Sequence, residues 1–342
     1  YNGIDIGNYS ISNQTSTTAN ITSRPAGVTG ITVFGVTVNN KIYDGTVTAP
    51  LDTSNISYSG LVDGDDFTGS YTGVFANANV GTGKTVTITS SYSGADVGNY
   101  SVTNQSSATG NIVPKALTAT ASASNKVYNG NNTATTTLTL SGLIGSETLG
   151  QSVGSTFNNK NVGTGKTVTV NSITLANGSN GGLAANYSIN TGQTTTANIT
   201  AKTLTATSSA SNKVYDGITT ATSTLTFSGL IGSETLGQTV GSTFDNKNVG
   251  TGKTVTVNSI TLADGSNGGL AANYSISPGQ TTTANVTAKS LTVSGITSAN
   301  KTYDSNTTAA LNTSSVNYGG LISGDTLTGT YSGVFNNANV GT

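Results

Sequence analysis

Residues 213–227 read Lys-Val-Tyr-Asp-Gly-Ile-Thr-Thr-Ala-Thr-Ser-Thr-Leu-Thr-Phe, and the fold class can be predicted from this segment. Its second half alternates Thr with small or apolar side chains at a period of two, which is typical of a half-buried β-strand. Segments 204–207, 254–257 and 259–262 show the same alternation. Frequent glycines divide the chain into short segments, which favours strands and disfavours helices. The sequence therefore predicts β structure.

The run Lys-x-Tyr-Asp-Gly returns along the chain, so the protein is built from repeats. Its copies begin at Lys41, Lys126, Lys213 and Lys301, and their tyrosines lie 85, 87 and 88 residues apart. Two more runs follow in a constant order. They are Asn-Val-Gly-Thr, at Asn79, Asn161, Asn248 and Asn339, and Asn-Tyr-Ser, at Asn8, Asn99, Asn186 and Asn273.

These runs divide the chain into modules. Residues 1–30 end an earlier repeat, 31–115, 116–202 and 203–289 are complete repeats, and 290–342 begin a further one. The second and third repeats are nearly identical, whereas the first and fourth form another subtype. Each complete repeat has enough apolar side chains for a marginal core of its own. The joins are too short to be flexible linkers, so we expect neighbouring modules to be held at a fixed angle.

The fold class expected is all-β, with small sandwich-like modules in tandem in an elongated array. Strand order cannot be read from periodicity, so an immunoglobulin-like sandwich and a β-grasp variant both stay open.

The Lys-x-Tyr-Asp-Gly run lies where a strand ends, and it allows two interpretations. In the first, it is a structural corner whose Tyr closes the end of the core, with its hydroxyl hydrogen-bonded, while Asp caps the turn. In the second, the ring and the cation form a tip that contacts a ligand such as a sugar. We favour the corner. The residues assigned to this structural turn motif are Lys41, Tyr43, Asp44, Lys126, Tyr128, Asn129, Lys213, Tyr215, Asp216, Lys301, Tyr303 and Asp304.

Composition excludes several classes of function. The chain has no His and no Cys, so imidazole catalysis, thiolate nucleophiles, disulfides and His or Cys metal sites are absent. Only 13 basic residues balance 14 acidic ones over 342 residues, which disfavours a nucleic-acid partner. No apolar stretch is long enough for a membrane span, and no membrane insertion is expected. We expect no catalytic residue, no cofactor and no metal.

Two local motifs suggest a phosphate-binding loop and a calcium site, but their residues do not fit either ligand. Gly-Lys-Thr follows Asn79, Asn161 and Asn248, yet the glycine that a phosphate loop needs five residues earlier is missing, and a strand follows where a helix is required. The acidic run Asp63-Gly-Asp65-Asp66 has carboxylates suited to calcium, but the second and third repeats keep one acid there. A solvated turn is the preferred interpretation.

That remaining acid occurs at matching positions, as Asp65, Glu147, Glu234 and Asp325. Together with the motif Lys and an Asn near the end of the repeat (Asn198, Asn285), it supplies the residue types of a Lys–Asn isopeptide bond. A surface lysine and a turn acid are the commoner interpretation.

As a set, these runs resemble the tandem YDG/MBG-type repeats of large haemagglutinin-like bacterial adhesins. They include Lys-Val-Tyr-Asp-Gly, Phe-x-Asn-Lys-Asn-Val-Gly-Thr-Gly-Lys at Phe157 and Phe244, Asn-Tyr-Ser and the closing Thr-Ala-Asn-Ile-Thr-Ala-Lys. The resemblance covers essentially the whole chain and implies a mainly-β, extracellular, non-enzymatic module. Asn129 and Ser305 depart from the pattern and put an invariant role of that turn in doubt.

The leading hypothesis is therefore a structural segment of an extracellular bacterial adhesin or surface filament. Its partners would be neighbouring repeats and other copies of itself, and residues 1–30 of one copy could complete 290–342 of another by strand donation. A simpler explanation of those matching ends is an excerpt of a longer repetitive chain. The alternative function is a multivalent adhesive module that binds glycans or cell surfaces, and an enzyme is a distant third.

Overall fold

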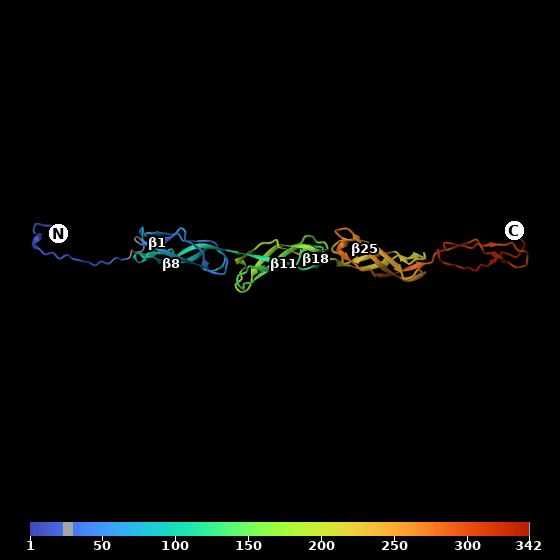
Figure 1. The fold of residues 1–342 in the computed structure, drawn as a ribbon. Coiled ribbons are helices and arrows are strands. Elements are labelled where there is room, and N and C mark those ends of the chain that lie inside the picture. The colour runs from blue at the N-terminus through green and yellow to red at the C-terminus, as the bar shows by residue number, and fades with distance from the viewer. Residues whose placement is uncertain (23–29, 342) are drawn as a thin grey trace. The chain divides into compact units, whose positions relative to one another are not determined.

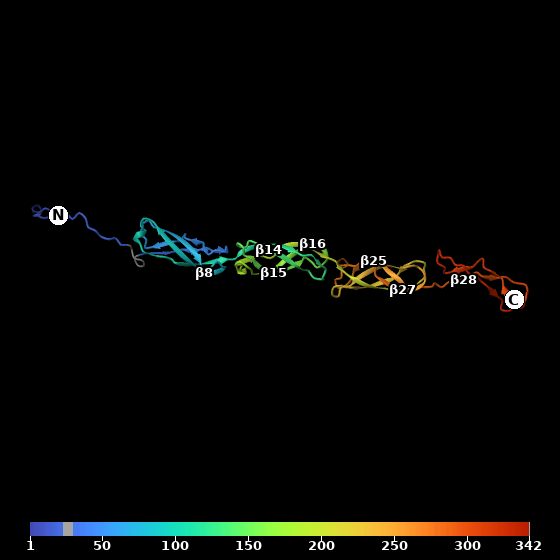
Figure 2. The same cartoon turned by 90° about the horizontal axis from the view of Figure 1, so that it is seen from below.

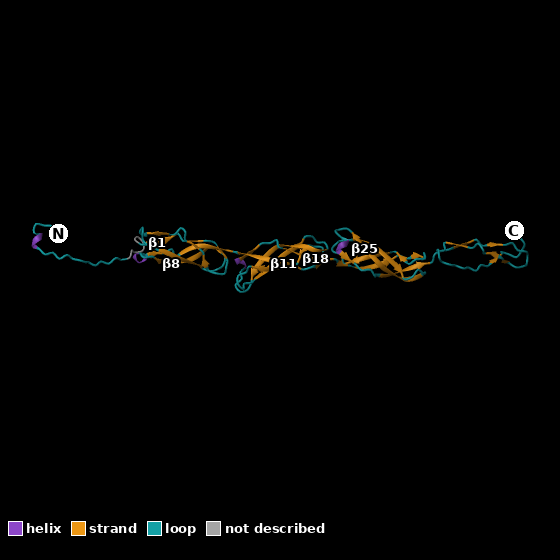
Figure 3. Ribbon diagram, in the orientation of Figure 1, coloured by secondary structure: helices purple, strands orange, loops and turns teal. Residues whose placement is uncertain are grey.

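The computed structural model describes residues 1–22 and 30–341, and within these residues it consists mainly of strands and loops (Figure 3). Regular helix is limited in this part of the chain to four single 3₁₀ turns: η1 (Ile6–Asn8), η2 (Val97–Asn99), η3 (Ala184–Asn186) and η4 (Ala271–Asn273). None of them is long enough to cross a membrane. The prediction of an all-β chain of tandem modules is confirmed. Residues 23–29 of the predicted first segment lie outside the described residues.

The chain forms two compact units, and the division between them passes through the second repeat. The first unit comprises residues 1–122, 136–155 and 169–194, and the second comprises 123–135, 156–168 and 195–342. Each unit thus combines one complete repeat with part of the second repeat.

The first repeat, in the first unit, has two mixed sheets. The smaller sheet has the order β6-β1-β9, and the larger has the order β3-β10-β8-β7-β4. Strand β1 pairs antiparallel with β6 and parallel with β9, while β10 pairs parallel with β3 and antiparallel with β8. The strands are β1 (Ile31–Phe34), β2 (Thr37–Val38), β3 (Lys41–Ile42), β4 (Thr48–Ala49), β5 (Leu51–Asp52), β6 (Ser57–Ser59), β7 (Thr68–Phe75), β8 (Gly81–Ser93), β9 (Val102–Thr103) and β10 (Ser107–Val113).

The second repeat follows the same plan. Its sheets have the orders β14-β11-β17 and β12-β18-β16-β15-β13, and the long strands β15 and β16 run from one compact unit into the other. The strands are β11 (Lys115–Ala123), β12 (Lys126–Val127), β13 (Thr133–Ala134), β14 (Thr136–Ser141), β15 (Leu149–Phe157), β16 (Gly163–Asn177), β17 (Tyr187–Ile189) and β18 (Thr194–Thr200).

The third repeat, in the second unit, has the five-stranded order β21-β27-β25-β24-β22. Figure 1 labels strand β25 of this sheet, and Figure 2 labels β25 and β27. Its strands are β19 (Lys202–Thr203), β20 (Thr205–Ala210), β21 (Lys213–Val214), β22 (Thr220–Ala221), β23 (Ser223–Ser228), β24 (Leu236–Phe244), β25 (Gly250–Asp264), β26 (Tyr274–Ser275) and β27 (Thr281–Thr287). The segment 290–341 forms paired short strands: β28 (Thr292–Ser294), β29 (Thr297–Ser298), β30 (Thr308–Ala309), β31 (Leu311–Asn312), β32 (Asn317–Gly319) and β33 (Gly333–Val334).

One strand of the third repeat differs from the sequence expectation. Segments 254–257 and 259–262 were expected as separate strands, but both lie in β25. Its register against β24 shifts between Gly241 and Ser242, so that Asn258 occupies a bulge. Before the bulge, odd-numbered residues such as Val255 and Val257 face inward, and after it the even-numbered residues do. The alternation of the sequence therefore predicts two strands where the structure has one continuous strand.

Two buried clusters of the described residues span consecutive repeats. In the first unit, Tyr43 and Phe75 of the first repeat share a buried cluster with Leu117 and Tyr187 of the second. In the second unit, another cluster joins residues of the second repeat, including Tyr128, to residues of the third, including Tyr274. Part of the apolar burial of one repeat is thus supplied by the next.

Candidate functional site: the joint between repeats

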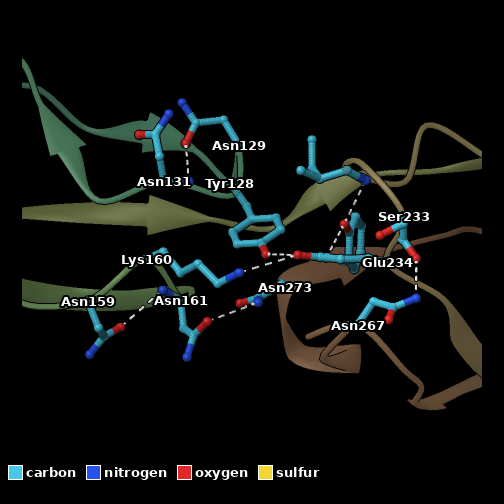
Figure 4. A network of polar contacts seen from close by, with 12 residues as sticks. Tyr128, Asn129, Asn131, Asn159, Lys160, Asn161, Ser233, Glu234, Asn267 and Asn273 are labelled. Carbon is cyan, nitrogen blue, oxygen red and sulfur yellow. Dashed lines mark hydrogen bonds and ion pairs between the residues drawn. The ribbon is translucent and has the colours of Figure 1, made fainter.

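The Tyr of the first and second turn motifs reaches across to the next repeat. We call the contact region between consecutive repeats the joint. The Tyr43 hydroxyl donates to Oε1 of Glu147 over 2.6 Å, and the Tyr128 hydroxyl donates to Oε1 of Glu234 over 2.6 Å (Figure 4). Both tyrosine side chains are almost fully buried, at 4% and 1% exposure. The Tyr therefore closes the end of its own core and bonds the following repeat.

A tight turn of the following repeat positions the carboxylate. The Glu147 amide donates to the Ile144 carbonyl over 3.0 Å, and Glu234 and Ile231 are related in the same way. Each carboxylate also accepts a second tyrosine from the Asn-Tyr-Ser run of its own repeat. Tyr187 donates to Oε2 of Glu147 and Tyr274 to Oε2 of Glu234, both over 2.6 Å.

The two tyrosines of each joint also contact one another. The rings of Tyr43 and Tyr187 are 5.4 Å apart at 80°, and those of Tyr128 and Tyr274 are 5.4 Å apart at 79°. Edge-to-face packing of this kind is a favourable aromatic geometry. Each carboxylate oxygen thus has one phenol donor, and the two rings hold each other in place.

Asparagines form a second set of contacts in each joint. Asn186 Nδ2 donates to Oδ1 of Asn79 over 3.1 Å, and the Val80 amide donates to Oδ1 of Asn186 over 2.9 Å. The next joint repeats both contacts, since Asn273 bonds Asn161 over 3.2 Å and the Val162 amide over 2.9 Å. Asn186 and Asn273 are 1% and 0% exposed, so these bonds satisfy amides that have no access to water.

Burial and the shared carboxylate shift the pKa values of the joint. Burial and the hydrogen bond to Glu147 raise the pKa of Tyr43 to about 12. Burial and Glu234 likewise raise the pKa values of Tyr128 and Tyr274. Burial opposes ionisation of Glu234, but the bonds from the two tyrosines and the charge of Lys160 outweigh it and hold its pKa below the ordinary value. The joint around Glu234 is therefore built on a charged carboxylate and two neutral phenols.

The other motif residues fold the loop that supports the Tyr. Lys41 Nζ donates to the carbonyls of Thr46 and Thr48 over 2.9 and 2.8 Å. The same pattern recurs at Lys126 (to Asn131 and Thr133), Lys213 (to Ile218 and Thr220) and Lys301 (to Asn306 and Thr308). The ammonium groups of the last three lie 5.5–5.9 Å from the ring centres of Phe157, Phe244 and Phe335.

The acidic or amide residue of the motif caps the turn. Asp44, Asn129, Asp216 and Asp304 each accept the backbone N–H two residues ahead through Oδ1. The three aspartates also pair with the motif lysine over 2.6–2.9 Å. Asn129 keeps the cap without the charge, which is why it substitutes for Asp at this position.

At the third joint, the described residues include the motif Tyr and the recurring acid. Tyr215 is half-buried and lines, with Asp325 and Ile322, a pocket of about 220 Å³. Lys247 Nζ lies 3.6 Å from Asp325 Oδ1, in the place that Lys160 takes 3.5 Å from Glu234. The last motif tyrosine, Tyr303, is 60% exposed.

The other candidate groups have separate partners. Asn198 and Asn285 accept the Gly165 and Gly252 amides over 2.8 Å, and Lys166 Nζ donates to Asn159 Oδ1 over 2.7 Å. These residues fold the Gly-Thr-Gly-Lys loop. Since the motif lysines bond carbonyls and the acids bond tyrosines, the described contacts do not bring together the Lys, Asn and acid of an isopeptide bond.

The acidic run of the first repeat folds its own turn. Asp65 accepts a hydrogen bond from Tyr100, and Asp66 accepts the Ala95 amide over 3.1 Å. Within residues 1–22 and 30–341, no group of three or more acidic side chains is placed to hold a metal ion.

The sequence pattern predicts the motif tyrosines as corner residues and the recurring acid as a turn residue, and it does not indicate that the two are bonded. The asparagines of the joint, Asn79, Asn161, Asn186 and Asn273, were noted only as repeat markers. The sequence feature that points to these asparagines is the constant order of the three runs, because all three runs contribute residues to the joint.

Comparison with known families gave one family, described as the YDG domain, which matches residues 27–109, 113–197, 200–284 and 287–342. A comparison with curated proteins gave no match.

Proposed function

Since the chain belongs to the YDG domain family along four consecutive repeats, we propose that it is a structural segment of an extracellular bacterial adhesin or surface filament. Its repeats would be locked head to tail by the tyrosine–carboxylate joint and would form a stiff stalk. The observation that carries this proposal is the recurrence of one joint geometry between different pairs of repeats.

Several features support a mechanical role. A single residue, Pro114, separates β10 from β11, and Ala201 alone separates β18 from β19. Adjacent repeats thus have little free chain between them. Each hydrogen bond to a charged group contributes about 1.5–3 kcal/mol. Two tyrosine hydroxyls donate to Glu147 and two to Glu234. A joint that bends must break these bonds and expose the apolar cluster beneath them.

Stiffness can be measured directly because the chain has no cysteine of its own. Cysteines introduced at the exposed Thr167 and Thr226 place spin labels on two repeats of the second unit. We expect one narrow distribution of distances between the labels in the otherwise unmodified chain. The matched variant Tyr128→Phe should broaden it. A broad distribution before any joint substitution would refute the stiff stalk.

Location and adhesion need separate measurements. Antibodies against the purified chain should label the outside of intact cells that produce it, and electron microscopy should show filaments under the label. Labelling only after the cells are broken would refute a surface role. The alternative, a multivalent adhesive module, predicts binding of the purified chain to a glycan array or to host cells.

A further inference from the structure

The glycine of the turn motif lies against the next repeat. Gly45, Gly130 and Gly217 have φ values of 77°, 80° and 83°. A Cβ built on each would meet the Cγ2 of an isoleucine of the following repeat, at 3.0, 2.6 and 2.8 Å respectively. These isoleucines are Ile144, Ile231 and Ile322. Each motif glycine thus provides space for a side chain of its neighbour.

The isoleucine is fixed in that position. The Ile231 amide donates to the Tyr274 hydroxyl over 3.0 Å, and the Ile231 carbonyl accepts the Glu234 amide over 3.0 Å. Ile144 makes the same two bonds in the first unit. The isoleucine therefore begins the turn that presents the carboxylate, and it cannot move away without displacing the tyrosine–carboxylate contacts.

The fourth motif carries a different residue at this position. Ser305 has a φ of 68°, close to those of the three glycines, so the turn keeps its shape. On a turn of this shape, a serine has its Cβ where the Cβ built on the three glycines meets the isoleucine. Atoms forced to such short separations repel strongly, and an isoleucine held as Ile231 is held cannot be accommodated.

We infer that the residue after the Asp or Asn of the motif determines which repeat can dock on that end. A repeat whose turn motif has Gly at this position can pack against a following repeat that has isoleucine at the start of the carboxylate turn. The end formed around Tyr303 and Ser305 instead fits a YDG repeat with a smaller residue, such as Ala, at that position. This inference rests on the proposed joint and adds a rule of pairing to it.

The test introduces the serine into an existing joint. In Gly130→Ser, exchange of the Ile231 amide with solvent deuterium should accelerate about ten- to a hundredfold. This range corresponds to the destabilisation that an added group usually causes in a packed site. The spin-label distance across this joint should broaden. Gly165→Ser is the matched control, because Gly165 also has a positive φ, of 58°, but an added Cβ meets nothing within 4 Å. It should leave exchange at Ile231 unchanged.

The double variant Gly130→Ser with Ile231→Ala identifies the cause. If the isoleucine is the obstacle, the smaller side chain restores slow exchange relative to Gly130→Ser alone. The inference is overturned if Gly130→Ser behaves like Gly165→Ser, or if Ile231→Ala gives no rescue. If Gly130→Ser unfolds the third repeat, the double variant still decides, because rescue supports the rule and continued unfolding refutes it. A mobile joint in the unmodified protein would refute the proposed function instead.

Discussion

Removing one phenol hydroxyl should weaken a single joint by a measurable amount. In Tyr128→Phe the ring stays in its buried site, and the 2.6 Å bond to Glu234 Oε1 is lost. Hydrogen bonds to a charged group contribute about 1.5–3 kcal/mol. Lys160 Nζ lies 3.5 Å from the same oxygen and compensates in part, so we expect a loss of about 2 kcal/mol.

Hydrogen exchange at single amides is the suitable assay, because a chain of repeats need not unfold in one step. A loss of about 2 kcal/mol corresponds to roughly thirtyfold faster opening of the joint. The amides of Ile231 and Glu234 report on it, since both lie in the carboxylate turn.

Tyr303→Phe is the matched control, because Tyr303 occupies the same motif position but is 60% exposed. Substitution there should change stability by no more than about 0.5 kcal/mol. Equal effects of the two variants would contradict the expected role of the Tyr128 hydroxyl. So would equally accelerated exchange in the first repeat, which contributes no residue to the Tyr128–Glu234 bond.

Three further outcomes are expected. Because the pKa of Glu234 is lowered in the fold, the carboxylate stabilises the joint fully above pH 4.5, and this stabilisation is lost as the pH falls through the folded pKa. Amide hydrogen exchange in this joint, measured over an acid titration, should accelerate accordingly, and Glu234→Gln should remove this dependence on pH. Because the pKa of Tyr43 is raised from 10.0 to about 12, its contribution is present below pH 10 and is lost as the pH rises through 12, and near-ultraviolet absorbance should show one late-titrating tyrosine fewer in Tyr43→Phe. Lys213→Met should leave the carbonyls of Ile218 and Thr220 without their ammonium donor and destabilise the loop by about 1–3 kcal/mol; unchanged exchange of loop amides would contradict this.

Much of the local structure is encoded in short segments. The alternation in 222–227 predicts strand β23, because side chains on a pleated strand alternate between two faces. The turn after Tyr215 follows from Asp216, whose side chain caps the backbone two residues ahead. Where a bulge shifts the phase, as at Asn258, the same reasoning divides one strand into two.

The repeats themselves, their order and their two subtypes are also contained in the sequence, because recurrence at a fixed spacing needs no structure to detect. The sequence likewise establishes that no His or Cys chemistry operates in this chain. It identified the acid at Glu147 and Glu234 as a recurring position.

Which copy of that acid Tyr43 and Tyr128 bond depends on the packing of whole repeats. Tyr128 has one candidate in its own repeat, Glu147, and another in the next, Glu234, and nearly identical repeats cannot distinguish the two. The structure selects Glu234, 106 residues away, because β12 ends where the second repeat contacts the third. Periodicity reports what each repeat contains, whereas the partner of a buried hydroxyl depends on how two repeats pack together, and that information is not local to either segment.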